Sequence, residues 1–214
     1  MIIDSARLIV MFSSIADAIS ADKDRLCALD GVIGDADHGI AMELGFKAVR
    51  NALGAEDMTQ AEPAMIFNTA AKSFLNVVGA SSGPLYATAF IRAGAAVKGK
   101  QQLETSDFVA VFQAMSKGIQ ERGKAEPGEK TMVDAWQPAA LAIGASLENG
   151  RNLADCIEAA LAAAGAGAEA TKKMVASKGR SARLGERSLG HMDPGAASAV
   201  TIIAAIKSAV LNAD

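Results

Sequence analysis

The stretch FVAVFQAMSKGI, residues 108–119, decides the fold class because its apolar side chains recur three or four positions apart. This spacing places them on one face of an α-helix, whereas a half-buried strand would alternate every second residue. The residues of this stripe are Phe108, Val111, Phe112, Met115 and Ile119. The segment therefore predicts an amphipathic helix that packs on a core.

Three more segments have the same helical spacing, and no segment shows convincing strand alternation. The most strand-like stretch, residues 1–12, is better explained as helix. The chain is also rich in Ala, Leu and Met, which favour helix. We therefore expect an all-α protein of about eight helices joined by glycine-rich loops. The further stripes are Leu8, Phe12, Ile15 and Ile19; Met42, Phe46, Val49 and Leu53; and Ile203, Ile206 and Val210.

Helix boundaries are indicated by capping residues. Thr59 and Glu62 have the spacing of a capping box before Met65, and Asn152 is placed to cap the segment that contains Ile157 and Leu161. Residues 160–170 are small and rich in Ala and Gly. We interpret them as a tightly packed helix interior, with a flexible linker as the alternative.

Composition predicts a single domain, residues 1–214, with half of its residues hydrophobic. The net charge of −3 gives no basic excess, so we expect no nucleic-acid partner. Cys27 and Cys156 lack CxxC spacing, which argues against a disulfide framework or a zinc site and fits a reducing cytoplasm. No apolar run approaches the length of a membrane span and no basic signal peptide begins the chain, so we expect no membrane partner.

The acidic loop Asp30–Gly39, DGVIGDADHG, carries the strongest chemical signal. Asp30, Asp35 and Asp37 lie within eight positions, and clustered carboxylates are stabilised by a cation among them. Oxygen ligands without a nearby thiolate suit Mg²⁺, whose open positions are commonly filled by phosphate oxygens. The loop therefore suggests phosphate chemistry, in which His38 is a candidate hydrogen-bond donor to phosphate.

Two other kinds of structure use similar residues. A polar turn that caps the next helix would also use Asp and Gly. An EF-hand starting at Asp35 would need Gly at its sixth position and Glu at its twelfth, but Ile40 and Phe46 stand there. The EF-hand interpretation therefore fails, and the polar turn stays open.

Three further glycine-containing loops hold polar residues that a plain bundle does not need. The small residues of 79–84, GASSGP, would let backbone N–H groups approach a phosphate. In 128–134, Lys130 could neutralise phosphate and Met132 could pack on a flat ring. In the last loop, Arg180 is a candidate phosphate fork. Taken alone, the loops at 79–84 and 128–134 are better explained as a turn and a helix start.

Other chemistries lack support. No GxxxxGK[ST] or GxGxxG motif is present, so any nucleotide would be bound by a helical route. Ser81 and Ser82 have no adjacent base, and neither cysteine lies in a loop of this kind. Both histidines, His38 and His191, do lie in these loops close to an Asp, which makes a functional role as reasonable as a structural one.

Taken together, the loops resemble one family, the nucleotide-binding L subunit, or L domain, of dihydroxyacetone kinase. Six segments in the family's order carry the resemblance and cover nearly the whole chain. They are residues 29–31 with 34–39, 79–86, 128–135, 178–182, 184–188 and 190–196. The sequence departs from the family pattern at Ala36, usually Gly, at Ala41, usually Asn, and at Glu129, usually Asp.

The resemblance implies a closed barrel of eight antiparallel helices, with the nucleotide held by lid-like loops at one end. Asp30, Asp35 and Asp37 would hold two Mg²⁺ ions that bridge the phosphates of ADP or ATP. The phosphates would be lined by His38, Gly79, Ala80, Ser81 and Ser82. The adenosine would be surrounded by Gly123, Met132, Arg180, Asp193 and Gly195. The predicted nucleotide site is completed by Gly39, Ile40, Ala41 and Pro194.

In that family a separate K subunit holds the ketose, and the L subunit presents the phosphoryl group. In one branch a phosphotransferase-system M subunit recharges bound ADP; in the other, K and L are fused and free ATP is the donor. The resemblance implies the phosphotransferase-system branch, in the cytoplasm and in glycerol metabolism. We also hypothesise that this chain carries no general base.

Three alternatives to this function stay open. The chain could be an L-type subunit for another acceptor, such as erythrulose or a fatty acid. It could act as a nucleotide-state sensor that docks on a transcriptional regulator. It could also be a metal-binding helical module without nucleotide, although such a module would not need the loops at 79–84 and 178–194.

Overall fold

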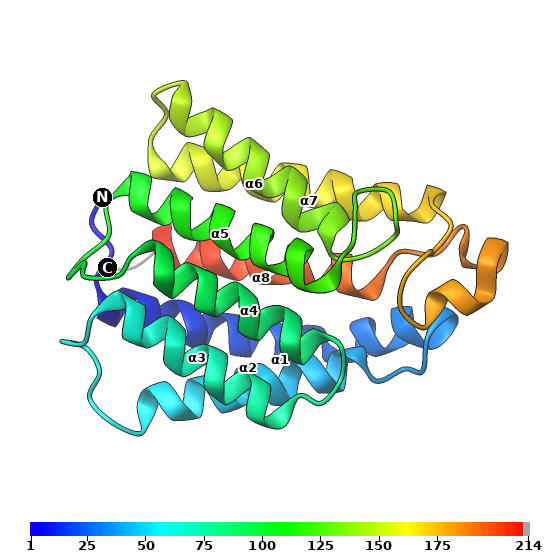
Figure 1. The fold of residues 1–214 in the computed structure, drawn as a ribbon, viewed down its shortest axis with the longest axis horizontal. Coiled ribbons are helices and arrows are strands. Elements are labelled where there is room, and N and C mark those ends of the chain that lie inside the picture. The colour runs from blue at the N-terminus through cyan, green and yellow to red at the C-terminus, as the bar shows by residue number, and fades with distance from the viewer. Residues whose placement is uncertain (212–214) are drawn as a thin grey trace.

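The computed structural model describes residues 1–211, which form eight α-helices joined by short loops (Figure 1). Residues 212–214 of the predicted domain lie outside the described part. The helices are α1 (Ser5–Ile33), α2 (His38–Gly54), α3 (Pro63–Val77), α4 (Ser82–Ala96), α5 (Thr105–Gly123), α6 (Val133–Glu148), α7 (Leu153–Ala170) and α8 (Pro194–Leu211). The all-α prediction is confirmed.

Consecutive helices pack side by side in alternating directions, and α8 packs back against α1. This last contact closes the ring, so the eight helices form the antiparallel barrel that the resemblance implies. Because directions alternate, the even-numbered helices all begin at one end of the barrel. Helix α1 begins, and α8 ends, at the opposite end (Figure 1).

The barrel interior is filled by interlocking aromatic rings. Phe46 lies at the centre of this cluster, with ring centroids 5.1 Å from Phe74, 6.0 Å from Tyr86 and 6.3 Å from Phe90. The rings meet at steep angles, an arrangement that adds to the energy of burial. Trp136 joins from α6 through Tyr86. All the predicted apolar stripes contribute buried residues to this core.

The first residues of the chain differ from the prediction of one continuous helix. Helix α1 begins at Ser5, where the Asp4 carboxylate accepts a hydrogen bond from the Arg7 N–H. Before it, Ile3 is buried and forms an isolated antiparallel bridge with Leu103. Among residues 1–211 this bridge is the one β interaction. The strand-like sequence of residues 1–12 therefore forms a β contact only at Ile3.

Two capping predictions have opposite outcomes. Asn152 caps α7, because its side-chain oxygen accepts from the Asp155 N–H at 3.0 Å. The capping box at Thr59 is wrong: α3 begins at Pro63, and the Thr59 hydroxyl donates to Asp57 instead. Proline is favoured in the first helical turn because its missing N–H would have no partner there.

Helix α8 corrects the expectation that no apolar segment approaches the length of a membrane span. Its 18 residues have a mean hydropathy of 1.6, enough by length and composition to cross a bilayer. However, 67% of this window is buried inside the barrel. A buried position against α1 and α7 explains its apolar character as that of a core helix.

Candidate functional site

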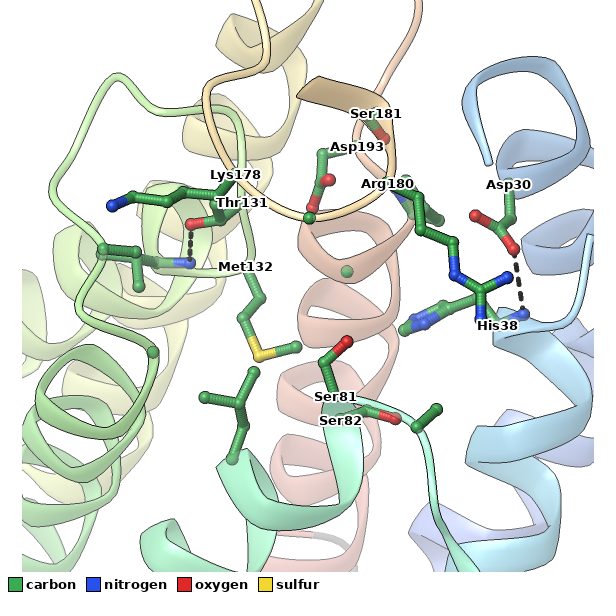
Figure 2. Close-up of a pocket in the computed structure, with 18 of the residues that line it drawn as sticks. Asp30, His38, Ser81, Ser82, Thr131, Met132, Lys178, Arg180, Ser181 and Asp193 are labelled. Carbon is green, nitrogen blue, oxygen red and sulfur yellow. Dashed lines mark hydrogen bonds between the residues drawn. The ribbon is translucent and has the colours of Figure 1, made fainter. Parts of the chain in front are cut away.

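A cavity of about 440 Å³ opens at the barrel end where α2, α4, α6 and α8 begin. Its size lies within the usual range for small-molecule sites. The segment between α7 and α8 passes over it, bringing Lys178, Arg180 and Ser181 to its rim (Figure 2). This segment contains two short 3₁₀ helices, Thr171–Lys173 and Ser181–Ser188.

The first residue of each even-numbered helix lines this cavity: His38 of α2, Ser82 of α4, Val133 of α6 and Pro194 of α8. The first turn of a helix leaves backbone N–H groups without partners inside the helix, and the helix dipole is positive there. The four helix dipoles therefore add positive partial charge to the cavity, although the His38 N–H already donates to Asp30 and the Ala196 N–H to Asp193. This arrangement suits an anionic ligand.

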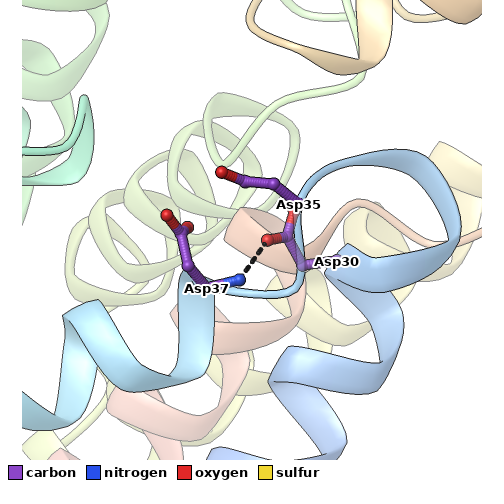
Figure 3. A group of neighbouring side chains, drawn as sticks. All are labelled: Asp30, Asp35 and Asp37. Atoms are coloured by element: carbon purple, nitrogen blue, oxygen red, sulfur yellow. Dashed lines mark hydrogen bonds between the residues drawn. The ribbon is translucent and has the colours of Figure 1, made fainter.

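Three carboxylates face one another at one side of the cavity (Figure 3). Asp30, in the last turn of α1, and Asp35 and Asp37, in the loop that follows, have oxygens within 4.8 Å of one another. Asp30 Oδ2 accepts hydrogen bonds from the N–H groups of Asp37, at 2.9 Å, and His38, at 3.2 Å. These bonds hold the loop so that the three carboxylates converge. An all-oxygen donor set of this kind fits Mg²⁺.

Ala36 occupies a strained place in this loop. Its φ of 64° lies in the left-handed region, which disfavours any side chain with a Cβ atom. This is one of the positions where the sequence departs from the family pattern, and glycine would adopt the same backbone without strain.

Ala36→Gly is therefore expected to raise the free energy of unfolding by about 1 kcal/mol. Urea denaturation followed by circular dichroism measures the change. Ala55→Gly is the matched control, because Ala55 follows α2 with an ordinary φ of −73°. There glycine should destabilise. If both variants lose the same free energy of unfolding, the backbone at Ala36 is not strained.

His38 and Arg180 set the charge on the carboxylate side. Burial lowers the pKa of His38 to about 4, an effect that the nearby Asp30 carboxylate only partly offsets. The imidazole is therefore neutral near pH 7. The Arg180 guanidinium forms an ion pair with Asp35 and supplies positive charge instead. Figure 2 shows Arg180 beside His38 and Asp30, away from Met132, so its side chain lies nearer the carboxylates than the predicted adenosine region.

The opposite side of the cavity is apolar. Leu85, Ile119, Ala125 and Met132 contribute to its wall, and Met132 extends toward Ser81 (Figure 2). Side chains of this kind suit a flat, uncharged ring. The cavity thus has a charged side and an apolar side, as a molecule with a phosphate at one end and an aromatic ring at the other would require.

Lys130 differs from its predicted role. Its side chain is buried, and Nζ donates hydrogen bonds to the backbone carbonyls of Thr171, at 2.6 Å, and His191. Burial lowers the pKa of this lysine, while Asp193 and Asp134 favour its charged form. Lys130 therefore fastens the loop before α6 to both ends of the segment between α7 and α8, and neutralising phosphate is not the task for which its ammonium group is placed.

Asp193 caps α8. Its Oδ2 accepts from the Ala196 N–H at 2.7 Å, and its own N–H donates to Thr171 Oγ1 at 3.0 Å. Burial raises the pKa of Asp193 to about 7, against the lowering effects of the Ala196 N–H and of Lys130. The predicted turn at 193–195 is thus a helix start that belongs to the same buried network as Lys130.

Most residues predicted for the site meet in this cavity. Its wall includes Asp30, Asp35, Asp37, His38, Ala41, Ala80, Ser81, Ser82, Gly123, Met132, Arg180, Asp193, Pro194 and Gly195. Three predicted residues lie outside the wall: Gly39, Ile40 and Gly79. Gly39 is buried between helices, where a Cβ atom would collide with the Lys23 carbonyl, so it serves the close packing of α1 on α2.

Other wall residues were not predicted. Leu85, Ile119 and Ala125 gave no signal beyond ordinary helix or loop composition, and Arg122 resembled any exposed residue of a last helical turn. His191, a candidate from its loop position, has an exposed side chain and contributes only its carbonyl to the network. Only the closed barrel shows which of these side chains face the cavity.

Known proteins are similar in sequence to this chain. The DAK2 domain family matches residues 32–208. The chain is 41% identical, over 85% of its length and 86% of the relative, to the ADP-binding subunit DhaL of the PEP-dependent dihydroxyacetone kinase of Escherichia coli (strain K12). It is 36% identical, over 85% of each chain, to the ADP-binding subunit DhaL of the PTS-dependent dihydroxyacetone kinase of Lactococcus lactis subsp. lactis (strain IL1403).

A solved structure shares the fold. The dihydroxyacetone kinase from C. freundii, crystallised in complex with AMP-PNP and Mg²⁺, superposes with a TM-score of 0.73 at 26% identity. The match covers 97% of this chain but 34% of that one, so the chain spans about a third of the C. freundii enzyme.

Proposed function

Because the chain belongs to the DAK2 domain family, as a relative of the DhaL subunits, we propose that it is the nucleotide-binding subunit of a dihydroxyacetone kinase. It passes phosphate from a magnesium-bound nucleotide to dihydroxyacetone held on a partner K subunit. The names of its relatives favour the branch in which bound ADP is recharged through the phosphotransferase system. Its two free cysteines support a cytoplasmic location.

One observation carries this proposal: four helix N-termini and three convergent carboxylates meet in a cavity that also has an apolar side. Anion-binding backbone and cation-binding side chains in one place suit a metal-bound phosphate chain. An apolar wall next to them suits the adenine ring. We extend the proposal to all 214 residues as a single domain.

The mechanism follows from what these residues hold. Asp30, Asp35 and Asp37 would bind two Mg²⁺ ions, which neutralise charge on the transferring phosphoryl group. The N-terminal turns of α2, α4 and α8 would receive the phosphate oxygens through those backbone N–H groups that have no partner in the protein, with Ser81 and Ser82 beside them. Arg180 adds a positive charge at the open side of the cavity.

We propose that this chain supplies no general base. His38 has a low pKa and contacts Ser198, and Asp193 uses its carboxylate to cap α8. The acceptor hydroxyl and its activation then belong to the partner subunit. Positioning and charge neutralisation are sufficient tasks for a phosphoryl-donor subunit.

Mass spectrometry of the small molecules released from purified, denatured protein tests this function, with metal analysis alongside. We expect ADP together with about two magnesium ions, the number that the resemblance implies. An empty protein that binds Mg-ATP reversibly would assign it to the branch that uses free ATP. Failure to bind either nucleotide would refute the proposal.

Exposed apolar side chains in and after the acidic loop offer a surface for the partner. Val32, in the last turn of α1, is 55% exposed, and Leu44, on α2, is 51% exposed. Val32 lies within the acidic loop and Leu44 follows it by five residues, and the phosphate held by this loop must be accessible to an acceptor on another subunit. We propose that the K subunit docks over these two side chains.

Leu44→Asp is therefore expected to weaken binding of the K subunit by about 10- to 100-fold, since a buried leucine side chain contributes about 1.5–3 kcal/mol. Surface plasmon resonance with a dihydroxyacetone-binding K subunit measures this. ADP affinity should not change. The control is Leu141→Asp on α6, where the leucine is 66% exposed. Equal binding by the Leu44 and Leu141 variants would refute the docking surface.

A further inference from the structure

Buried polar groups lie between the barrel core and the phosphate side of the cavity. Trp136 Nε1 donates to the Tyr86 hydroxyl at 3.4 Å, and burial raises the pKa of that hydroxyl to about 12. Ser198 Oγ lies 2.9 Å from His38 Nε2 and donates to the Gly195 carbonyl at 3.0 Å. Trp136, Tyr86 and Ser198 are fully buried.

The direction of each bond follows from counting protons. A serine hydroxyl has one hydrogen to donate and two lone pairs to accept with. Since the Ser198 hydrogen goes to the Gly195 carbonyl, Ser198 can only accept in its contact with His38. That contact therefore requires a hydrogen on His38 Nε2.

This arrangement gives both the Ser198 hydrogen and its lone pair a partner. The alternative, in which Ser198 donates to His38, would give up the bond to the Gly195 carbonyl. The neutral imidazole has one N–H, and a hydrogen on Nε2 leaves Nδ1 with a lone pair.

We propose that Ser198 is a positioning residue that holds His38 in the Nε2–H tautomer, so that the ring offers Nδ1 to the site as a hydrogen-bond acceptor. This inference deepens the proposed function and rests on it for its role in nucleotide binding. It revises the expectation that His38 donates a hydrogen bond to phosphate. A lone pair repels a bare phosphate oxygen, whereas it orients N–H or O–H groups near the phosphates.

Nitrogen-15 NMR of the wild-type protein, free of nucleotide, tests the tautomer directly. The ring nitrogen that carries hydrogen and the one with a lone pair have well-separated chemical shifts. The chain has only two histidines, and His191→Asn removes the other one, whose side chain is exposed. We expect the hydrogen on Nε2 of His38. A hydrogen on Nδ1 would overturn the proposal whatever the protein binds.

Ser198→Ala tests the positioning. Without its acceptor, His38 should show a mixture of tautomers, and ADP affinity in the presence of Mg²⁺, measured by isothermal titration calorimetry, should fall by about 3- to 10-fold. Tyr86→Phe keeps the contact between Ser198 and His38 and should leave the tautomer as in the wild type. An unchanged His38 spectrum in Ser198→Ala would also overturn the proposal.

A matched control separates positioning from stability. Ser116→Ala removes a buried hydroxyl from α5, away from the cavity wall, and should change neither the tautomer nor the affinity. If Ser116→Ala and Ser198→Ala lower ADP affinity equally, Ser198 acts only through the fold. If the wild-type protein binds no ADP while the tautomer is as expected, the proposed function fails and the assignment of the tautomer stands.

Discussion

Asp37→Ala is expected to abolish magnesium-dependent ADP binding while the barrel stays folded. The Asp37 side chain makes no capping hydrogen bond to α2, so the helix does not depend on it. Its charge, in contrast, is one of three that face the cation site. Removing one unit charge about 4 Å from a cation costs about 4 kcal/mol at the effective dielectric constant of a protein surface, or roughly a thousandfold in affinity.

Calorimetric titration with ADP, with and without Mg²⁺, measures this loss. Asp24→Ala is the control, because Asp24 is exposed on α1 and stands outside the acidic cluster. Asp35→Ala should behave like Asp37→Ala. Asp30→Ala should also lower stability, since Asp30 accepts the N–H groups of Asp37 and His38. Wild-type Mg-ADP binding by the Asp37 variant would disprove the assigned cation site.

Phe46→Ala should produce the largest loss of stability among single substitutions in the core. Phe46 is fully buried and its ring contacts those of Phe74, Tyr86 and Phe90. Truncation of a buried phenylalanine costs about 3–5 kcal/mol, because transfer energy is lost and a cavity remains. Since a domain is stable by about 5–15 kcal/mol, this change removes a large part of the total.

Urea denaturation followed by far-ultraviolet circular dichroism measures the effect. Leu44→Ala on the same helix is the control, because Leu44 is half exposed and should lose little. A Phe46 variant that unfolds at the wild-type urea concentration would show that the aromatic cluster does not stabilise the barrel. Saturating Mg-ADP should partly restore stability in Phe46→Ala, since the nucleotide binds only the folded state.

Much of the fold was predictable because its signals are local. The stripe at 108–119 and the Asn152 cap depend on residues within a few turns, and both are confirmed. The capping box at Thr59 failed for a local reason too: Pro63 starts α3 without it. The bridge between Ile3 and Leu103 could not be predicted, because it joins segments that only the closed ring of helices brings together.

The candidate site also has one part that was predictable from the sequence and one part that was not. The acidic loop is compact in sequence, so its three carboxylates could be recognised as one cluster. The convergence of four helix N-termini depends on the alternating directions of the whole barrel and leaves no motif. The role of Lys130 could not be predicted, because the carbonyls of Thr171 and His191 that accept from its ammonium group are distant in the sequence.

The contact of α8 with α1 has a consequence for how the protein is made. The hydrogen-bond partner of His38 is 160 positions away, and Thr201 binds Asp22 across 179 positions. At ordinary rates of translation the ribosome needs roughly 8–32 s to make the residues between His38 and Ser198. A nascent chain therefore has its acidic loop long before the rest of the site. It gains its nucleotide pocket only once α8 has left the ribosome, so incomplete chains do not compete for the nucleotide pool.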